Sequence, residues 1–350
     1  MNEIINIGGR AVGKEQPCFI IAEMSGNHNM DFNRAVRILE AAKYAGADAI
    51  KLQTYTADTI TIDCDEECFR TRDDSLWSGT TLYELYKRAY TPWEWQPKLK
   101  EIADELGIIL FSSPFDLSSV DFLEGFNVPA YKIASFEITD IPLIRKVAKT
   151  KKPIIISTGI ARLSDIELAI KTCYEEGNHN VILLKCTSAY PAPYNEMNLK
   201  SMHSMQDIFQ SIVGLSDHTL GDEIALAATA LGSKVIEKHL TLNRSDGGPD
   251  AEFSMEPEEF RIMVNKVRNV ESALGTKEYI FDNKMEDRRK DGRSLFFVED
   301  MKCGEEININ NVKSIRPGIG LHTKHWESLI GRKVKRDIKK GTPVSWDDFD

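Results

Sequence analysis

The chain has 350 residues, 42% of them hydrophobic and 28% charged, which is enough to bury a full core in one large domain with a smaller one beside it. Its 44 Lys and Arg against 54 Asp and Glu give a net charge of −10, which excludes the basic footprint of a general nucleic-acid-binding protein. No apolar run approaches the ~18–20 residues that span a membrane, and no signal peptide is expected at the start. Six scattered cysteines without a CxxC pair are typical of reduced thiols, so we expect a cytoplasmic protein.

Eight short apolar runs alternate with amphipathic stretches along most of the chain. The runs are rich in Ile, Val and Leu, as expected of strands that are buried on both faces. The amphipathic stretches 31–46, 92–107, 163–177 and 256–275 often open on Asp or Ser and close on Gly, residue types that cap helices. The runs lie at residues 18–24, 49–55, 108–114, 130–135, 153–158, 181–187, 211–217 and 235–242.

Eight strand–helix units in about 260 residues predict an α/β fold, a (β/α)8 TIM barrel. An open, doubly wound sheet is the alternative, but no GxGxxG follows the first run. Beyond the barrel, segments 300–312 and 337–349 form a weak repeat, and each is expected to be a turn followed by a short strand. We expect a barrel domain over 1–280, a charged linker over 281–293 and a small β-rich domain over 294–350.

All eight runs turn polar at their C-terminal ends, where a parallel barrel builds its active site. The alternative is that strand ends simply meet solvent. However, the opposite ends of six of these runs begin with Cys18, Ala49, Ile108, Ala130, Pro153 and Val181, and this asymmetry favours a site. The polar residues are Glu23; Lys51 and Gln53; Ser112 and Ser113; Lys132, Ser135 and Glu137; Ser157 and Thr158; Lys185, Thr187 and Ser188; Ser216, Asp217 and His218; and Glu237, Lys238 and His239.

Two of these strand ends predict a metal site. Because side chains alternate along a strand, Ser216 shares a face with His218, and Glu237 shares a face with His239. If both faces point into the barrel, two imidazoles converge beside a carboxylate and can hold a divalent metal with positions left open for substrate. The alternative is a pair of histidines with ordinary hydrogen-bond partners. His28 is a weaker third candidate, and His179, His203, His322 and His325 are expected at the surface.

Lys51 and Lys132, together with the short hydroxyl side chains at the strand ends, predict a site for a phosphate or a carboxylate. No Walker-type motif is present, so a nucleoside triphosphate is not indicated. Lys132 and Ser135 face opposite sides of a regular strand, so both can reach the site only if the strand ends near Ala134.

The stretch 71–99 holds Trp77, Trp93 and Trp95. These residues are expected either to pack against an outer helix or, on a long loop at the catalytic end, to lay aromatic surface over a ligand that carries apolar groups.

The same residues carry a family resemblance. FIIAEMSGNHN, FSSPFD, LKCTSAYPAP, GLSDHTLG, IEKHLTL and GGPDAEFS resemble the sialic acid synthases in order and spacing, and SIRPGIG at 314–320 resembles that family's antifreeze-like (SAF, β-clip) domain. TLYELYKRAYTPWEW and YKIASFEITDIPLI are most similar to the pseudaminic acid synthases within the family. Met30 and Asp31 depart from the NHNG pattern that is common in relatives.

The resemblance implies a metal-dependent transferase. It would condense phosphoenolpyruvate with the open-chain aldehyde of 2,4-diacetamido-2,4,6-trideoxy-L-altropyranose, giving pseudaminic acid and phosphate by C–O cleavage. It also implies Mn²⁺ or Mg²⁺ held by His218 and His239, catalytic roles for these two and for Glu23, Glu137 and Glu237, and a domain-swapped homodimer. The implied contacts are Lys51, Gln53, Ser113, Lys132, Ser135, Ser157, Ser188 and Ser216 for phosphoenolpyruvate, and Glu23, Asn27, Glu137, Tyr190, Asp250 and, from the partner subunit, Arg316 for the sugar.

Two alternatives to this function stay open at the level of sequence. One is an N-acetylneuraminate or legionaminate synthase with the same mechanism. The other is a sensor without catalytic activity that binds a phosphosugar through the same barrel.

Overall fold

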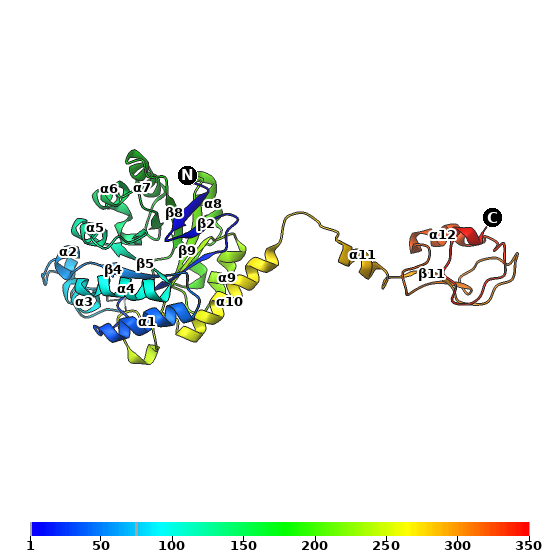
Figure 1. Ribbon diagram of the computed structural model, residues 1–350, viewed down its shortest axis with the longest axis horizontal. Helices are drawn as coiled ribbons and strands as arrows, with labels where there is room; N and C mark the ends of the chain where they lie inside the picture. Colours follow the sequence, from blue (N-terminus) through cyan, green and yellow to red (C-terminus); the bar gives the residue numbers. More distant parts are fainter. Residues whose placement is uncertain (1, 74–75, 350) are drawn as a thin grey trace. The chain divides into compact units, whose positions relative to one another are not determined.

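In a computed structural model, which describes residues 2–73 and 76–349, the chain forms two compact units, Met1–Gly275 and Thr276–Asp350 (Figure 1). The division falls directly after helix α10 (Pro257–Leu274). Within the two described ranges, no helix combines the length and the apolar character that crossing a bilayer requires.

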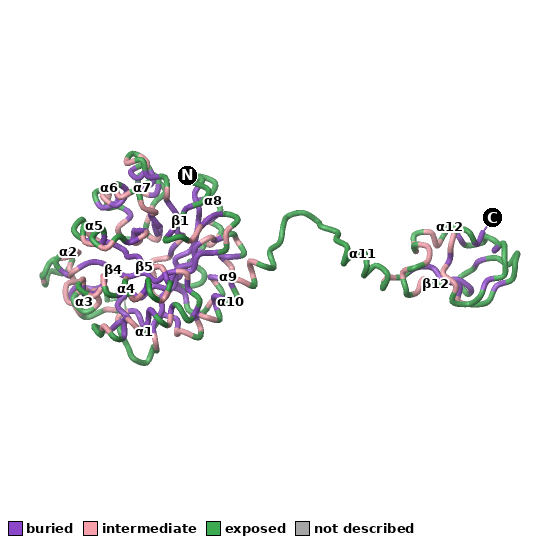
Figure 2. The backbone as a smooth tube through the Cα atoms, viewed as in Figure 1, coloured by how far each residue is buried: buried purple, intermediate pink, exposed green. Residues whose placement is uncertain are grey.

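Eight parallel strands of the first unit close into a barrel in the order β10-β3-β4-β5-β6-β7-β8-β9. Each strand lies within one of the apolar runs, and the predicted (β/α)8 fold is confirmed. The strands are buried because one face packs inside the barrel and the other packs beneath the helices, visible as the purple core of Figure 2. They are β3 (Phe19–Glu23), β4 (Ala49–Thr54), β5 (Ile109–Pro114), β6 (Tyr131–Ile133), β7 (Ile154–Ser157), β8 (Val181–Cys186), β9 (Ile212–Asp217) and β10 (Val235–His239).

The helices of the barrel begin and end near the capping residues seen in the sequence. The side chain of Asp31 accepts hydrogen bonds from two backbone N–H groups at the start of α1, and Gly107 adopts a left-handed conformation (φ 67°) after α4. Besides α10, the helices are α1 (Phe32–Tyr44), α2 (Ala57–Ile60), α3 (Leu82–Ala89), α4 (Gln96–Leu106), α5 (Leu117–Glu124), α6 (Ile141–Lys149), α7 (Leu163–Glu175), α8 (Ser201–Phe209) and α9 (Glu223–Ala230).

An antiparallel hairpin that the sequence pattern did not predict precedes the barrel. It consists of β1 (Ile4–Ile7) and β2 (Arg10–Gly13). Its buried side chains join the core of the barrel, and its turn packs against Ile109 at the start of β5. Strands of four residues are too short to show a clear alternation of apolar and polar positions, which is why the pattern missed them.

Strand β6 is unusually short, and this shortness positions two site residues. It ends at Ile133, and Ser135–Thr139 form a 3-10 helix. The chain therefore leaves the regular strand geometry between Lys132 and Ser135. Because the strand ends before Ala134, Lys132 and Ser135 can both face the site.

The second unit has its own small core, formed by residues such as Leu295, Phe297 and Leu329. Strands β11 (Ser294–Phe297) and β12 (Val312–Ile315) pair antiparallel. Helix α12 (Trp326–Leu329) follows, and α11 (Asn283–Arg289) occupies most of the stretch expected to be a linker.

The two repeats in this unit pair with each other. Met301 and Ile338 exchange two backbone hydrogen bonds of 2.9 Å. Asp300 and Asp337, at equivalent repeat positions, each accept a hydrogen bond from a backbone N–H of the other repeat (2.8 and 3.0 Å). The expectation of a strand after each turn is wrong: isolated bridges follow the turns, and a 3-10 helix (Trp346–Asp348) capped by its preceding serine ends the second repeat.

Candidate active site at the barrel mouth

Lys51 lies at the centre of a buried charge cluster at the C-terminal ends of the strands. Its Nζ lies 2.7 Å from Glu23 Oε2 and 3.6 Å from Glu237 Oε1, and all three side chains are at most 5% exposed. Lys51 also donates a hydrogen bond to Ser113 Oγ (3.3 Å), and Ser216 Oγ donates one to Glu237 (3.2 Å). Side chains from β3, β4, β5, β9 and β10 thus meet inside the barrel.

Lys132 provides a second buried cation. Its Nζ donates hydrogen bonds to Ser157 Oγ (2.7 Å) and to the carbonyl oxygen of Ile133 (3.1 Å). Burial lowers the pKa of Lys132. Burial alone would raise the pKa of Glu237, but the charges of Lys132 and Lys51 hold it below its usual range. Two cations and several hydroxyl donors in one place suit an anionic ligand.

Gly159, which the sequence analysis missed, leaves room between two of the expected hydroxyls. Its backbone N–H donates a hydrogen bond to Ser135 Oγ (3.1 Å), and a Cβ at this position would clash with Ser188 Oγ. Ser188 Oγ is buried and has no hydrogen-bond partner among residues 2–73 and 76–349. A buried hydroxyl without a partner is expected to bind a ligand. A glycine directly after the Ser–Thr end of the fifth run was the available signal.

His218 and His239 face each other, with ring centroids 5.4 Å apart and planes at 67°. His218 Nδ1 lies 3.0 Å from the carbonyl oxygen of Thr187, so in the neutral ring the other nitrogen carries the free lone pair. His239 Nδ1 is buried without a partner in the described chain. Burial lowers the pKa of His239 well below its usual value, which keeps the ring in the neutral form that binds metals.

The histidine pair fits a divalent metal with only two protein ligands. In the part of the chain that the structure describes, no group of three or more His, Cys, Asp or Glu side chains is arranged to hold a metal. The two imidazoles would therefore supply part of the coordination, and substrate and water would complete it. Cys186, also missed by the sequence analysis, lies beside the pair, with its Sγ 3.8 Å from His218 Nδ1.

His28 is a less suitable metal ligand than the sequence suggested, because both of its ring nitrogens already have hydrogen-bond partners. Its Nδ1 accepts a hydrogen bond from the backbone N–H of Met30 (3.1 Å), and its Nε2 lies 3.2 Å from Thr91 Oγ1. Burial lowers the pKa of His28 to about 4. Its partners make it a brace for the loop after β3, in which Met30 keeps a left-handed backbone (φ 56°).

A network of hydrogen-bonded side chains lies next to the lysine cluster. Gln53 donates hydrogen bonds to Glu23 Oε1 (2.8 Å) and Ser25 Oγ (3.1 Å), and Ser25 donates one to Asp250. Gln53, expected to support phosphoenolpyruvate, thus contacts Glu23, which is expected to bind the sugar. Glu137 Oε2 is buried without a partner among the described residues, and burial raises the pKa of Glu137 to about 7.

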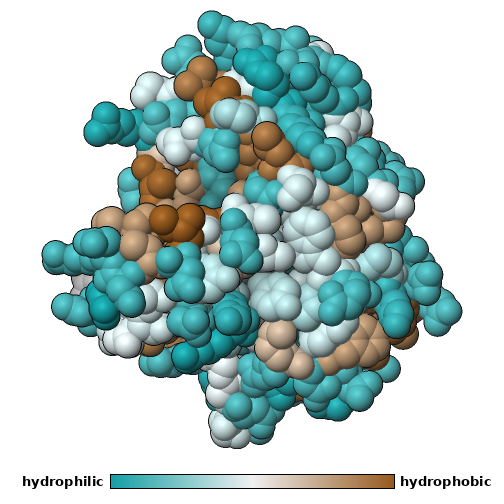
Figure 3. Space-filling model, turned by 90° about the vertical axis from the view of Figure 1, so that its left-hand side faces the viewer, coloured by the Kyte–Doolittle hydropathy of each residue, from teal (hydrophilic) through white to brown (hydrophobic). Residues whose placement is uncertain are grey.

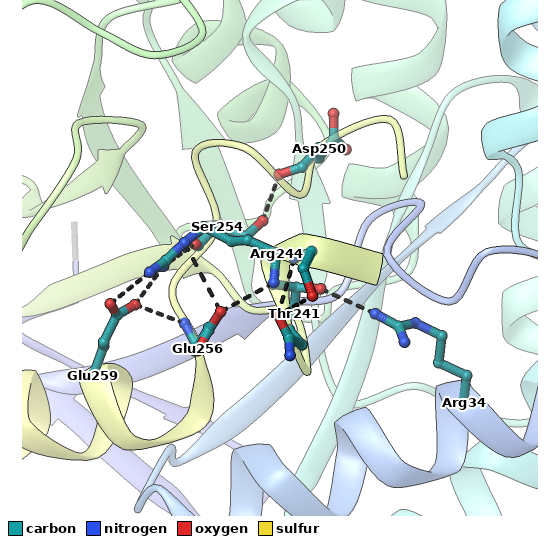
Figure 4. Close-up of polar contacts among 9 residues, drawn as sticks. Arg34, Thr241, Arg244, Asp250, Ser254, Glu256 and Glu259 are labelled. Atoms are coloured by element: carbon teal, nitrogen blue, oxygen red, sulfur yellow. Dashed lines mark hydrogen bonds and ion pairs between the residues drawn. The ribbon is translucent and has the colours of Figure 1, made fainter. Parts of the chain in front are cut away.

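Two arginines brace the loop that carries Asp250 (Figure 4). Arg34 of α1 donates a hydrogen bond to Asp246 Oδ2 (2.5 Å). Arg244 donates two hydrogen bonds to the carboxylate of Glu259 (2.5 and 2.7 Å). The loop after β10 is therefore tied to helices α1 and α10.

Asn27 forms hydrogen bonds with the same loop after β10. Its Nδ2 donates hydrogen bonds to the carbonyl oxygen of Leu240 (3.0 Å) and to Ser254 Oγ (2.9 Å). Only its buried Oδ1 has no partner in the described ranges, so this oxygen alone remains for the sugar contact that the family resemblance implies.

The three tryptophans of the 71–99 stretch have different surroundings. Trp77 donates its indole N–H to the carbonyl oxygen of Pro249 (2.7 Å), and its ring lies 5.5 Å from Tyr190, whose ring lies 4.4 Å from His218. Trp93 instead stacks on a phenylalanine of α5, and Trp95 packs on a phenylalanine of α1 and on His28.

Several polar strand-end residues belong to the outer face of the barrel. Lys238 and Asp217 form a 2.8 Å ion pair with side chains 1% and 0% exposed, and Lys238 also donates to the carbonyl oxygen of Thr219 (2.7 Å). Ser112 hydrogen-bonds Thr54 at 2.6 Å. Because side chains alternate, these neighbours of site residues point beneath the helices. Arg316 belongs to the second unit, where it is exposed.

Comparison with known proteins identifies the families to which both parts of the chain belong. A model described as the NeuB family matches residues 38–279, and one described as the SAF domain matches residues 292–350. A pseudaminic acid synthase of Helicobacter pylori is 45% identical, over 96% of this chain and 98% of that protein. An N,N'-diacetyllegionaminic acid synthase of Legionella pneumophila is 37% identical, over 99% and 98%. The crystal structure of an N-acetylneuraminic acid synthetase from Leptospira borgpetersenii in complex with citrate aligns with a TM-score of 0.73 at 32% identity, over 82% of this chain and 95% of that one.

Proposed function

The chain belongs to the NeuB family, with a C-terminal SAF domain, and from this premise we propose that it makes pseudaminic acid. It is a transferase of the sialic-acid-synthase type, which joins phosphoenolpyruvate to a sugar. The proposed acceptor is the open-chain aldehyde of 2,4-diacetamido-2,4,6-trideoxy-L-altropyranose. The 45% identity to pseudaminic acid synthases over nearly the whole chain supports this choice of sugar.

The proposed reaction has a simple bond balance. C3 of phosphoenolpyruvate forms a bond to the aldehyde carbon, and the aldehyde oxygen takes up a proton. Water adds at C2, and the C2–O bond to phosphate then breaks to release inorganic phosphate and leave the keto acid. The observation that carries the proposal is the placement of two buried lysines and two facing imidazoles at one barrel mouth.

The charged groups of the mouth divide between the two substrates in this proposal. Lys51 and Lys132 bind the anionic groups of phosphoenolpyruvate, and the nearby serine hydroxyls orient them. Glu237 lies between Lys51 and Ser216 and positions water for addition at C2. Glu23, Glu137 and Asp250 face the sugar, and burial raises the pKa of each. The pKa of Glu137, about 7, suits this carboxyl group to hold or release a proton near neutral pH.

We propose that His218 and His239 hold Mn²⁺ or Mg²⁺. Such a metal supplies Lewis-acid polarisation of a carbonyl oxygen when it is bound. The unpartnered Nδ1 of His239 supports this assignment, since a buried ring nitrogen is otherwise costly to leave without a bond.

The sugar is tested by supplying phosphoenolpyruvate with each of three aldehydes and measuring phosphate release, with and without a chelator. We expect rapid release with the altro sugar, little with N-acetylmannosamine or the legionaminate precursor, and none in chelator until Mn²⁺ or Mg²⁺ is restored. A preference for another sugar would identify that sugar as the substrate. Undiminished turnover in chelator would contradict the proposed need for a metal. Tight binding of phosphoenolpyruvate without turnover of any sugar would favour the sensor.

We further propose a domain-swapped homodimer in which Arg316 of one copy reaches the site of the other. Arg316 is exposed and has no ion-pair partner among the described residues. Loops after the barrel strands expose apolar side chains, with Phe136, Ile160 and Leu220 47–57% exposed. Figure 3, which views the side that carries α2 and α3, shows hydrophobic patches among hydrophilic residues. Such surfaces suit a protein contact.

Charge supports the same contact. Residues 276–350 hold 16 Lys and Arg and 14 Asp and Glu, a net charge of +2. Because the whole chain has a net charge of −10, residues 1–275 have a net charge of −12. Opposite net charges favour association of one copy's second unit with another copy's barrel.

The swap is tested with two impaired variants, assayed at a sugar concentration below the raised KM of the first. Arg316→Ala should raise the KM for the sugar, and His239→Ala should abolish turnover. Mixed and allowed to exchange subunits, they should recover activity because the hybrid dimer contains one intact site. No recovery from a mixture shown to contain hybrids would contradict the swap.

In keeping with six cysteines that form no disulfide, we propose a cytoplasmic enzyme.

A further inference from the structure

We propose that Trp77 makes the site selective for sugars whose terminal carbon is a methyl group rather than a hydroxymethyl group. The inference rests on the proposed function, because it concerns the sugar of that reaction. It names one residue as the determinant of one feature of the substrate.

Trp77 is held in place at the barrel mouth from two sides. Its indole N–H donates a hydrogen bond to the carbonyl oxygen of Pro249 (2.7 Å), the residue before Asp250. Its own loop is closed at the base by hydrogen bonds from the N–H and the hydroxyl of Thr71 to the carbonyl oxygen of Thr80 (3.0 and 2.9 Å). The ring is therefore positioned independently of a ligand.

Because the indole N–H is already used, Trp77 offers a ligand only its apolar ring. The ring is half-buried and lies 5.5 Å from Tyr190 with the planes at 54°. Tyr190 in turn lies 4.4 Å from His218 and 5.3 Å from Phe253, and Phe253 lies 4.8 Å from His239. A continuous aromatic wall thus runs from Trp77 to the two histidines.

An aromatic wall distinguishes the two kinds of sugar by the cost of desolvation. A methyl group gains contact with the ring, whereas a hydroxyl group placed against it loses hydrogen bonds to water. One group of this size in an apolar site changes kcat/KM by about 10–200-fold. Both diacetamido-trideoxy sugars carry the methyl group, so Trp77 separates them from N-acetylmannosamine and not from each other.

The test compares kcat/KM for the 6-deoxy diacetamido aldehyde with that for N-acetylmannosamine. In Trp77→Ala we expect the ratio to fall by about 10-fold or more, chiefly through a loss with the 6-deoxy sugar. Trp93→Ala is the matched control, since Trp93 stacks on Phe122 of α5 and should leave the ratio unchanged. Binding of phosphoenolpyruvate, measured by calorimetry, should be the same in both variants.

A second readout guards against a folding defect. Quenching of tryptophan fluorescence on addition of the 6-deoxy sugar should disappear in Trp77→Phe and persist in Trp93→Phe. If the wild type turns over the 6-deoxy sugar and Trp77→Ala has the same ratio of kcat/KM values as the wild type, the inference about Trp77 is wrong. The proposed function is not affected by that result. A wild-type enzyme that releases no phosphate with any sugar would overturn the proposed function and the inference with it.

Discussion

Ion pairs of nearly identical length occur in the barrel and in the second unit. Lys238 and Asp217 of the barrel lie 2.8 Å apart with side chains at most 1% exposed, whereas Lys302 and Asp337 lie 2.7 Å apart with side chains 78% and 60% exposed. In water the exposed pair gains little, because solvent screens both charges. In the barrel, water does not reach the two side chains, so each charge is stabilised mainly by the other. Burial rather than distance therefore decides what a charged pair contributes.

The largest expected effect comes from removing one member of the buried pair. Lys238→Met leaves Asp217 charged and without its cation beneath the helices, so the free energy of unfolding should fall by about 3–5 kcal/mol. Urea unfolding followed by circular dichroism measures the loss. Adding Asp217→Asn removes the stranded charge and keeps an acceptor for Thr219, so the double variant should recover part of the stability. A single variant as stable as the wild type would show that the pair is not needed.

A smaller effect is expected from Glu137, whose buried Oε2 has no hydrogen-bond partner among the residues that the structure describes. Burial raises its pKa from about 4.5 to about 7, so between these pH values the folded chain holds a proton that the unfolded chain releases. Its contribution to stability is present below pH 4.5 and is lost as the pH rises through 7, by up to about 3 kcal/mol. Glu137→Gln should remove this dependence. The measurement is the difference between the wild-type and variant free energies of unfolding at pH 5 and pH 8, and equal differences at both would contradict the assignment.

The smallest effect is expected from the exposed pair and serves as the control for the buried one. Lys302→Met makes the same chemical change as Lys238→Met, but its partner remains in water. The free energy of unfolding, measured in urea as for Lys238→Met, should not change measurably. If it fell as far as in the buried variant, the contrast between the two regions would not depend on burial.

Much of the barrel could be predicted because its pattern is local. Each apolar run is bounded by capping and turn residues, and each became a strand. The pairing of His218 with His239 followed from alternation along two strands. The four-residue strands of the hairpin were too short for such a pattern, and the repeat in the second unit showed equivalence of Asp300 and Asp337 but not that the two copies pair with each other.

The sequence by itself determined the eight strands, their polar ends and the family, because these depend on the order of residues along the chain. Only the tertiary structure decided which polar residues meet: it brought Lys51 between Glu23 and Glu237, turned Lys238 to Asp217 on the opposite face, and separated Trp77 from Trp93 and Trp95. The physical reason is that a side chain's energy depends on burial and on its partners. Residues far apart in the sequence supply both.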